Sequence, residues 1–216
     1  MRVILKMMNR PWPICKRRPA DGRNIPEGTR GRLTRWWAWI GLSALLLGGF
    51  QPLAAKDNLP FVGATLPKLI LETPAEEGDK KYLGLGKGGK FSLQQVEGTL
   101  LLVEIIGVYC PLCHKQAPGF NRLFQRIQKD PRLKAKVKFL AVAAGGTATE
   151  IAYLRREFAI PFPIVNDARF EVHKQLGEPR TPFTMLLDRN RKVLFAHLGV
   201  IEDLDSFFQK IAGLVP

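Results

Sequence analysis

Two long apolar stretches interrupt the alternation of hydrophobic and polar positions in the part of this chain that follows residue 55. Residues 99–109 are hydrophobic almost without a break, and residues 137–144 form a second run of the same kind. A strand with one face in water alternates apolar and polar residues, whereas a strand buried on both faces is apolar throughout. The pattern therefore predicts two central strands in a sheet that is covered on both sides.

Helical periodicity follows the first of these runs. From Pro111 onwards, apolar residues recur on one helical face, namely Ala117, Phe120, Leu123, Phe124 and Ile127. Three further segments read as helices, at residues 147–158, 168–176 and 202–214. Thr147 or Thr149 supplies an N-cap for the first of these three.

Shorter segments complete the predicted fold. Strands or extended pieces are expected at residues 65–71, 91–93, 162–165, 183–188 and 192–198, and the last two read as a hairpin. The polar, glycine-rich residues 72–90 are expected to form an irregular loop. Strands that alternate with helices and end in a hairpin predict an α/β fold, a three-layer sandwich with a central mixed β-sheet flanked by helices.

The N-terminal segment has the pattern of an export signal. Basic residues 30–35 precede the uncharged run 36–50, and small residues follow up to Ala55. The apolar run is about 15 residues long, or about 20 if residues 52–55 are included, so an uncleaved anchor stays open beside cleavage after Ala55. We divide the chain into a basic leader with a signal peptide or membrane anchor (1–55), an N-terminal extension with the glycine-rich loop (56–90) and the main domain (91–216).

The formal net charge of +14 does not indicate a nucleic-acid partner. The leader carries 10 Lys/Arg and 2 Asp/Glu, so more than half of the excess lies in residues 1–55. The remaining positive charge is spread among predicted helices and turns, as expected of a solvated surface.

The three cysteines are Cys15, in the leader, and the pair Cys110 and Cys113. A bridge across two residues closes a very small loop and stabilises a fold little, so chemistry explains the pair better than structure does. Cys110 stands where the first buried strand gives way to a helix, whose unpaired N–H groups and partial positive charge favour a thiolate. We therefore expect Cys110 to be the nucleophile and Cys113, one turn later, to resolve the mixed disulfide. Pro111 suits a first helical turn because its missing N–H would be unpaired there.

Glu104 is the one charged residue in the strand at 99–109. A carboxylate buried on both sides of a sheet is costly, which suggests a function. We expect Glu104 to lie beneath the dithiol with a raised pKa, ready to accept the proton that Cys113 loses. The alternative is a solvated position at the sheet edge.

With these motifs in order, the chain resembles the thioredoxin superfamily over residues 60–214. The resemblance rests on segments 89–93, 101–104, 109–113 and 117–118, and within the superfamily it is strongest to periplasmic TlpA-like thiol–disulfide oxidoreductases and their redoxin relatives. It implies that Glu104 is the buried acid of the family and that Pro182 is its cis-proline. It also implies that the backbone of Thr181 pairs with the extended chain of a substrate.

The resemblance is incomplete around the dithiol. Tyr109 stands where the family usually has Trp, and Leu112 and His114 replace common residues. We expect Tyr109, Pro111 and Leu112 to contact the substrate beside Thr181. The dipeptide between the cysteines tunes the redox potential, so the direction of electron flow stays open.

Three other chemistries compete with a redox dithiol. The first is covalent c-type haem, because Cys110 to His114 also satisfies C-x-x-C-H with His114 as iron ligand. The second is redoxin-type peroxidase activity, which the missing hydroxyl at Gly107 disfavours. The third is a zinc or copper site formed by the two thiolates with His114, His173 and His197, which only the C-x-x-C spacing supports.

We conclude from the sequence that the chain is an extracytoplasmic, for instance periplasmic, thiol–disulfide oxidoreductase without a cofactor or metal. The resemblance favours a reductase of protein disulfides, with apocytochrome c cysteines as a candidate substrate and a membrane electron donor. Contact with the membrane is expected only through an uncleaved leader.

Overall fold

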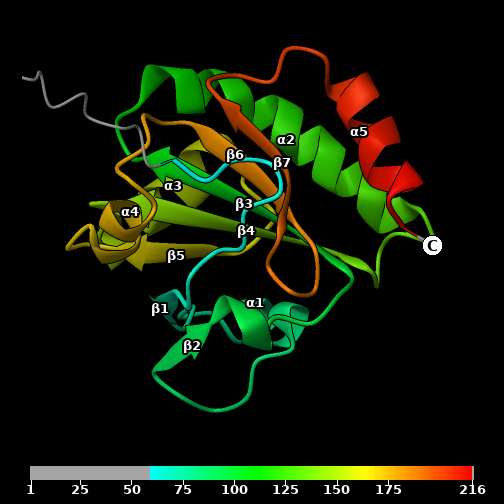
Figure 1. Ribbon diagram of the computed structural model, residues 1–216. Coiled ribbons are helices and arrows are strands. Elements are labelled where there is room, and N and C mark those ends of the chain that lie inside the picture. The colour runs from blue at the N-terminus through cyan, green and yellow to red at the C-terminus, as the bar shows by residue number, and fades with distance from the viewer. Residues whose placement is uncertain (1–58, 216) are drawn as a thin grey trace, which may run out of the picture. The chain divides into compact units, whose positions relative to one another are not determined.

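The computed structural model describes residues 59–215, so the leader, its signal or anchor and Cys15 lie outside the described residues. Within this part, five strands form one mixed sheet in the order β5-β4-β3-β6-β7 (Figure 1). The central strand β3 (Leu100–Gly107) runs parallel to β4 (Val137–Ala144), which in turn runs parallel to β5 (Ile164–Asp167). On its other side β3 pairs antiparallel with β6 (Phe183–Leu187), and β6 forms the predicted hairpin with β7 (Val193–Leu198).

Three helices cover one face of this sheet. They are α2 (Pro111–Lys129), α3 (Ala148–Phe158) and α5 (Leu204–Gly213). The alternation within β3 explains why both faces are apolar: Leu100, Leu102 and Ile106 join the core on this side, while Leu101, Val103 and Ile105 join the core on the opposite side. The predicted three-layer sandwich is confirmed.

The opposite face is covered by the short helix α4 (Glu171–Gln175) and by the segment that precedes β3. This segment holds a two-stranded antiparallel sheet of β1 (Ile70–Glu72) and β2 (Lys90–Ser92), the helix α1 (Glu77–Leu83) and the 3-10 turn η1 (Leu93–Gln95). Its buried leucines pack against the sheet, among them Leu69, Leu71 and Leu83.

The expectation of an irregular loop over residues 72–90 was wrong where α1 lies. Leu83 is fully buried, and Gly84 ends the helix in the left-handed conformation with φ 71°. Asp79, also buried, forms an ion pair with Arg155 of α3. A seven-residue helix gains its stability from such tertiary contacts, and the surrounding glycines conceal it in the sequence.

The other predicted elements are confirmed within three residues of their expected ends, except the segment expected at 65–71, of which only residues 70 and 71 lie in a strand, β1. Thr147 is the N-cap of α3 and shares a capping box with Glu150. None of the helices in residues 59–215 is long and apolar enough to cross a bilayer.

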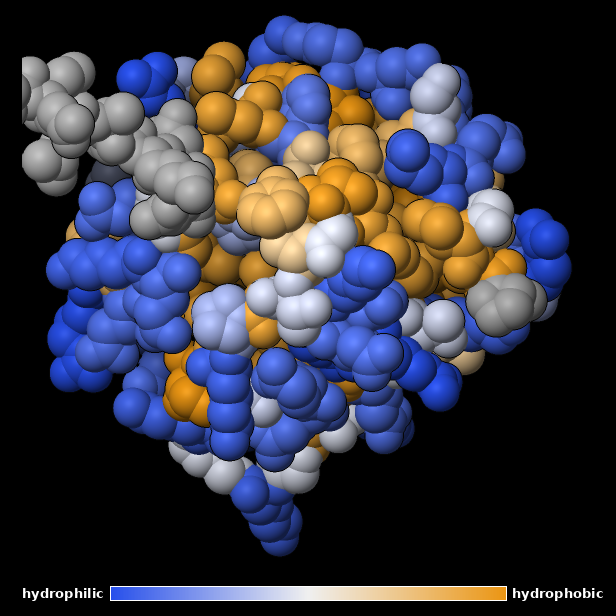
Figure 2. Space-filling view, viewed as in Figure 1, coloured by the Kyte–Doolittle hydropathy of each residue, from blue (hydrophilic) through white to orange (hydrophobic). Residues whose placement is uncertain are grey.

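Figure 2 shows how the surface divides on the face seen in Figure 1. Hydrophobic side chains gather over β6 and β7, whereas charged side chains dominate over β1, β2 and α1. At the end of β7, Leu198 is 48% exposed. Because β6 runs antiparallel to β3 and pairs with β7, this end of β7 lies at the same edge of the sheet as the carboxyl end of β3.

Candidate active site

Cys110 lies at the carboxyl edge of the sheet, in the N-cap position of α2. Its sulfur accepts a hydrogen bond from the backbone N–H of Cys113 at 3.2 Å and lies 3.3 Å from the carbonyl oxygen of Thr181. Partial burial raises the pKa of Cys110, but hydrogen bonds from the Cys113 thiol, from Thr181 and from backbone N–H groups outweigh it. The net effect lowers the pKa of Cys110, as expected of a nucleophilic thiol at a helix start.

Cys113 lies one helical turn later and is only 6% exposed. Burial is the main reason why the pKa of Cys113 is raised well above that of an ordinary thiol, and the neighbouring Cys110 raises it further. The two cysteines therefore differ in the way that an attacking and a resolving thiol differ. Cys113 stays protonated until a base takes its proton.

The bond between Thr181 and Pro182 is cis, as the family resemblance implied. Because Phe183 pairs with Ile105, the start of β6 places Thr181 and Pro182 against the carboxyl end of β3. A Cβ on Gly107 would come within 3.1 Å of the Thr181 hydroxyl and 3.3 Å of the Cys110 Cβ. Glycine at position 107 thus allows Thr181 to approach the dithiol closely.

Glu104 is buried in β3, with 5% of its surface exposed, and does not reach a solvated sheet edge. Its side chain lies on the α2 side of the sheet, where it accepts a 2.6 Å hydrogen bond from the amide of Gln116. Burial raises the pKa of Glu104 to about 7, and the Gln116 bond opposes part of that rise. A carboxyl group with this pKa can both take up and release a proton near neutral pH.

A small cavity of about 20 Å³ lies beside the dithiol, and its lining includes Glu104, Cys113 and His114 together with apolar side chains. This volume is large enough for one water molecule, and a water there would relay a proton between Cys113 and Glu104. Haem does not fit. The cavity is far too small, His114 Nε2 is 2.7 Å from the Val108 carbonyl oxygen, and the ring stacks on Phe158.

The residues expected to contact substrate surround Cys110 and point outwards. Tyr109 is 75% exposed and Leu112 50% exposed, and Pro111 between them is also exposed. The Tyr109 hydroxyl donates to Glu150 at the start of α3, which ties the dithiol segment to that helix. The exposed Leu198 lies at the same edge of the sheet as these side chains.

Sequence reasoning missed two contributors to this site. Gln116 falls on the buried face of α2, three residues after Cys113, and a polar residue at that position is a signal that could have been read. The side chain of Thr181 also contacts both cysteines, although only its backbone was expected to matter. His173 and His197 are hydrogen-bonded to the carbonyl oxygens of Pro179 and Val200, and no metal-binding cluster occurs within residues 59–215.

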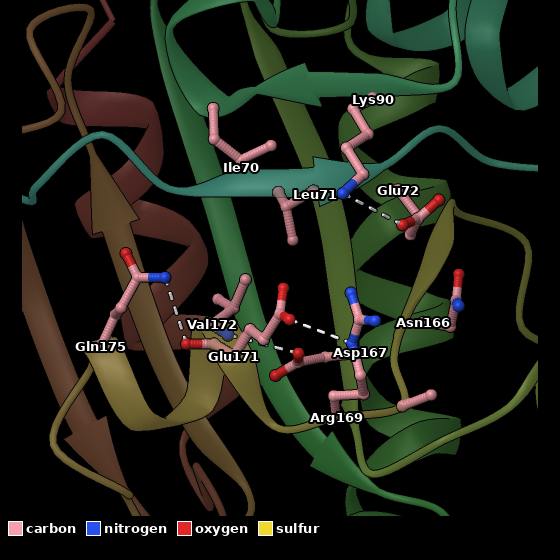
Figure 3. Close-up of a pocket in the computed structure, with 11 residues that line it drawn as sticks. Ile70, Leu71, Glu72, Lys90, Asn166, Asp167, Arg169, Glu171, Val172 and Gln175 are labelled. Carbon is pink, nitrogen blue, oxygen red and sulfur yellow. Dashed lines mark hydrogen bonds and ion pairs between the residues drawn. The ribbon is translucent and has the colours of Figure 1, made fainter.

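A larger cavity, of about 370 Å³, lies between β1 and the turn from β5 into α4 (Figure 3). Its charged groups pair with one another, Lys90 with Glu72 and Arg169 with Glu171. The buried Asp167 accepts hydrogen bonds from backbone N–H groups at the start of α4. The charged side chains that line this cavity are therefore paired within the fold, and their presence needs no ligand to explain it.

Comparison with known proteins agrees with this geometry. A family model described as AhpC/TSA matches residues 62–203, which is most of the described chain. The chain belongs to the AhpC/TSA family. One curated relative is the thiol-disulfide oxidoreductase ResA of Geobacillus thermodenitrificans. The two sequences are 26% identical over 152 residues, which cover 69% of this chain and 78% of ResA.

Solved structures show the same fold for this AhpC/TSA protein. The thioredoxin domain of a thiol-disulfide oxidoreductase from Bacteroides vulgatus has a TM-score of 0.55 at 15% identity, over 72% of this chain and 99% of that domain. A secreted disulfide oxidoreductase of Mycobacterium tuberculosis, homologous to E. coli DsbE, has a TM-score of 0.51 at 15% identity, over 68% and 96% of the two chains. The curated relatives are thiol-disulfide oxidoreductases, and this chain has the Cys110–Cys113 pair that such chemistry needs. The protein is therefore a thiol–disulfide oxidoreductase of thioredoxin-like fold.

Proposed function

We propose that this protein reduces disulfide bonds in other proteins outside the cytoplasm, with Cys110 as attacking and Cys113 as resolving thiol. The observation that carries the proposal is the placement of the two thiols: Cys110 is partly exposed at the N-cap of α2, whereas Cys113 is buried one turn later. This placement lowers the pKa of Cys110 and raises that of Cys113. The first thiol is thereby prepared to attack, and the second is kept protonated until the first has reacted.

The reaction takes two steps. The Cys110 thiolate attacks one sulfur of the partner's disulfide, so that a mixed disulfide forms and the other partner sulfur leaves as a thiolate. Cys113 then passes its proton to the Glu104 carboxylate, directly or through one water, and attacks the Cys110 sulfur. The mixed disulfide breaks and the second partner sulfur leaves as a thiolate. The partner disulfide is thereby reduced to two thiols, and the Cys110–Cys113 dithiol is oxidised to a disulfide.

The partner docks at the edge of the sheet where Thr181 and Pro182 face the dithiol. The Thr181 carbonyl, 3.3 Å from the Cys110 sulfur, lies where an extended partner chain can pair with it. Tyr109, Leu112 and Leu198 offer exposed apolar contacts around this point. Such a surface suits the flexible, partly apolar chain of an unfolded or partly folded protein.

The groups that stabilise the Cys110 thiolate influence the direction of electron flow. Strongly oxidising dithiols owe their high potential to strong stabilisation of the reduced thiolate. Among the described residues, the groups that lower the pKa of Cys110 are thiol, hydroxyl and backbone donors, all neutral. A thiolate held by neutral donors favours a lower potential and therefore the reductase direction.

We propose that the protein acts outside the cytoplasm on protein partners. The leader has the pattern of an export signal or anchor, and the Mycobacterium relative is described as secreted. In that compartment the protein would exchange disulfides with protein thiols, among which apocytochrome c cysteines are a candidate, and would draw electrons from a membrane donor. Nucleic acid is not an expected partner.

The reduction potential of the Cys110–Cys113 pair tests the direction. Equilibration with defined ratios of reduced and oxidised dithiothreitol or glutathione, followed by alkylation and mass spectrometry, gives the value. We expect it nearer to the roughly −270 mV of thioredoxin than to the roughly −120 mV of DsbA. A potential close to that of DsbA would assign the protein as an oxidase instead.

Peroxidase activity is the second candidate. Gly107 lacks the hydroxyl that redoxin-type peroxidases place three residues before the reactive cysteine, but the Thr181 hydroxyl contacts Cys110 from another strand end and could take its place. Hydrogen peroxide consumption by the reduced protein decides between the two functions. Fast turnover that is lost in Thr181→Val, with slow reduction of protein disulfides, would favour the peroxidase.

A further inference from the structure

Gln116 connects three parts of the fold that meet behind the dithiol. It lies on α2, one turn beyond Cys113, and only 3% of its surface is exposed. Its Nε2 donates to Glu104 Oε1 at 2.6 Å, and its Oε1 accepts from the backbone N–H of Ile201 at 2.8 Å. Both polar ends of one buried side chain are therefore used.

The bond to Ile201 fixes which way the amide points. A backbone N–H can only donate, so it must meet the oxygen end of the Gln116 amide, and the NH₂ end must then face Glu104. The segment that carries Ile201 is itself held in place, since the Gly199 N–H donates to the Pro182 carbonyl oxygen at 2.8 Å. Gln116 cannot turn its acceptor towards Glu104 without leaving the Ile201 N–H unpaired.

Apart from Gln116, no side chain within the described residues forms a hydrogen bond or ion pair with Glu104. From α2, Cys113 and His114 share the small cavity with it, and the rest of that cavity is apolar or backbone. Its neighbours in the sheet are Ala141 on β4 and Thr184 on β6. The hydroxyl of Thr184 is buried and makes no hydrogen bond within the described residues. Beyond Thr184, His197 of β7 follows in register and bonds to Val200.

We propose that Gln116 is a positioning residue, which orients the Glu104 carboxylate and stabilises its ionised form so that it can accept the proton of Cys113. The proposal rests on the role of Glu104 in the proposed function. A donor that is locked towards a carboxylate favours the charged over the protonated acid. Burial alone would keep Glu104 protonated at neutral pH and unable to act as a base.

Substitution of Gln116 by Met tests this, because Met has a similar length but no donor. The direct readout is the Glu104 carboxyl titration in the full, reduced protein, followed by ¹³C NMR of labelled glutamate and assigned through the signal lost in Glu104→Gln. We expect the Glu104 pKa to rise by roughly one to two units. The acid limb of the pH–rate profile for release of a mixed disulfide should shift upwards with it.

Two further variants separate this role from a structural one. Thr184→Val removes the other buried polar neighbour of Glu104, which makes no bond to it, and should leave the Glu104 pKa within about 0.5 unit of its original value. Gln116→Glu keeps an acceptor for the Ile201 N–H but removes the donor and adds a like charge, so the Glu104 pKa should rise again. Circular dichroism and thermal unfolding confirm that each variant is folded.

Different results would contradict the role of Gln116 and the role of Glu104 in resolution. An unchanged Glu104 pKa in both Gln116 variants, or an equal rise in Thr184→Val, overturns the role of Gln116. A raised Glu104 pKa with an unmoved pH–rate profile supports Gln116 but contradicts the role of Glu104 in resolution. In the Glu104→Gln background, Gln116→Met should no longer move the profile, and a remaining shift would show that Gln116 acts by another route.

Discussion

Replacing Glu104 by Gln should make the reduced protein more stable at alkaline pH while slowing its chemistry. Glutamine is similar in size and can still accept the hydrogen bond that Gln116 donates to Oε1 at 2.6 Å. It carries no proton that titrates. The variant therefore isolates what the buried carboxyl contributes to the pH dependence of folding.

The magnitude follows from the displaced pKa. Burial raises the pKa of Glu104 from 4.5 to about 7, so the folded state binds this proton more tightly than the unfolded state does. The stabilisation from the proton is complete below about pH 4.5 and is lost as pH rises towards 7. A shift of this size corresponds to about 3 kcal/mol at roughly 1.4 kcal/mol per pH unit.

Urea unfolding of both proteins between pH 4 and 8.5, with a reductant to keep the dithiol open, measures the difference. We expect the free energy of unfolding of Glu104→Gln, relative to the original protein, to rise by about 3 kcal/mol over this range and to level off above pH 7. All other titrating groups are shared and cancel in the comparison. A difference that stays constant within about 1 kcal/mol would refute the reasoning, as would one that falls with pH.

Two other predictions concern the dithiol and the edge of the sheet beside it. Alkylation of the reduced protein across pH, followed by mass spectrometry, should modify Cys110 with an apparent pKa below that of an ordinary thiol and leave Cys113 almost unmodified; faster modification of Cys113 would reverse the assignment. Gly145→Ala should destabilise the protein by more than Gly199→Ala, because both glycines have positive φ but only a Cβ at Gly145 would overlap the ring of Phe170. Thermal unfolding of the two variants tests this, and equal losses would show that backbone conformation alone matters.

Much of the fold could be predicted because its central strands are apolar on both faces. The uninterrupted run in β3 and the helical face of α2 depend on local periodicity, which a sequence displays directly. The dithiol could be placed for the same reason, since a strand end followed by Pro111 marks a helix start. The helix α1 could not, because its stability comes from the burial of Leu83 and the ion pair between Asp79 and Arg155.

The polar network behind the dithiol shows the limit of sequence reasoning more clearly. Glu104 was recognisable as a lone charge in an apolar strand. Its partner Gln116 lies 12 positions away, and the N–H that locks Gln116 belongs to Ile201, 85 positions further on. Contacts of this kind depend on how helices pack on the sheet, and no local pattern encodes them. The approach of the Thr181 side chain to the cysteines likewise depends on the pairing of β6 with β3.

The central claim is that Cys110 attacks a protein disulfide and Cys113 resolves the product. The most direct test is to mix reduced Cys113→Ser with a disulfide-bonded protein such as insulin and to map covalent adducts by mass spectrometry. We predict a stable mixed disulfide at Cys110 in this variant, none in Cys110→Ser, and only a transient one in the original protein. An adduct at Cys113 in the Cys110→Ser variant that forms as fast as the one at Cys110, or no adduct in either variant, would contradict the account.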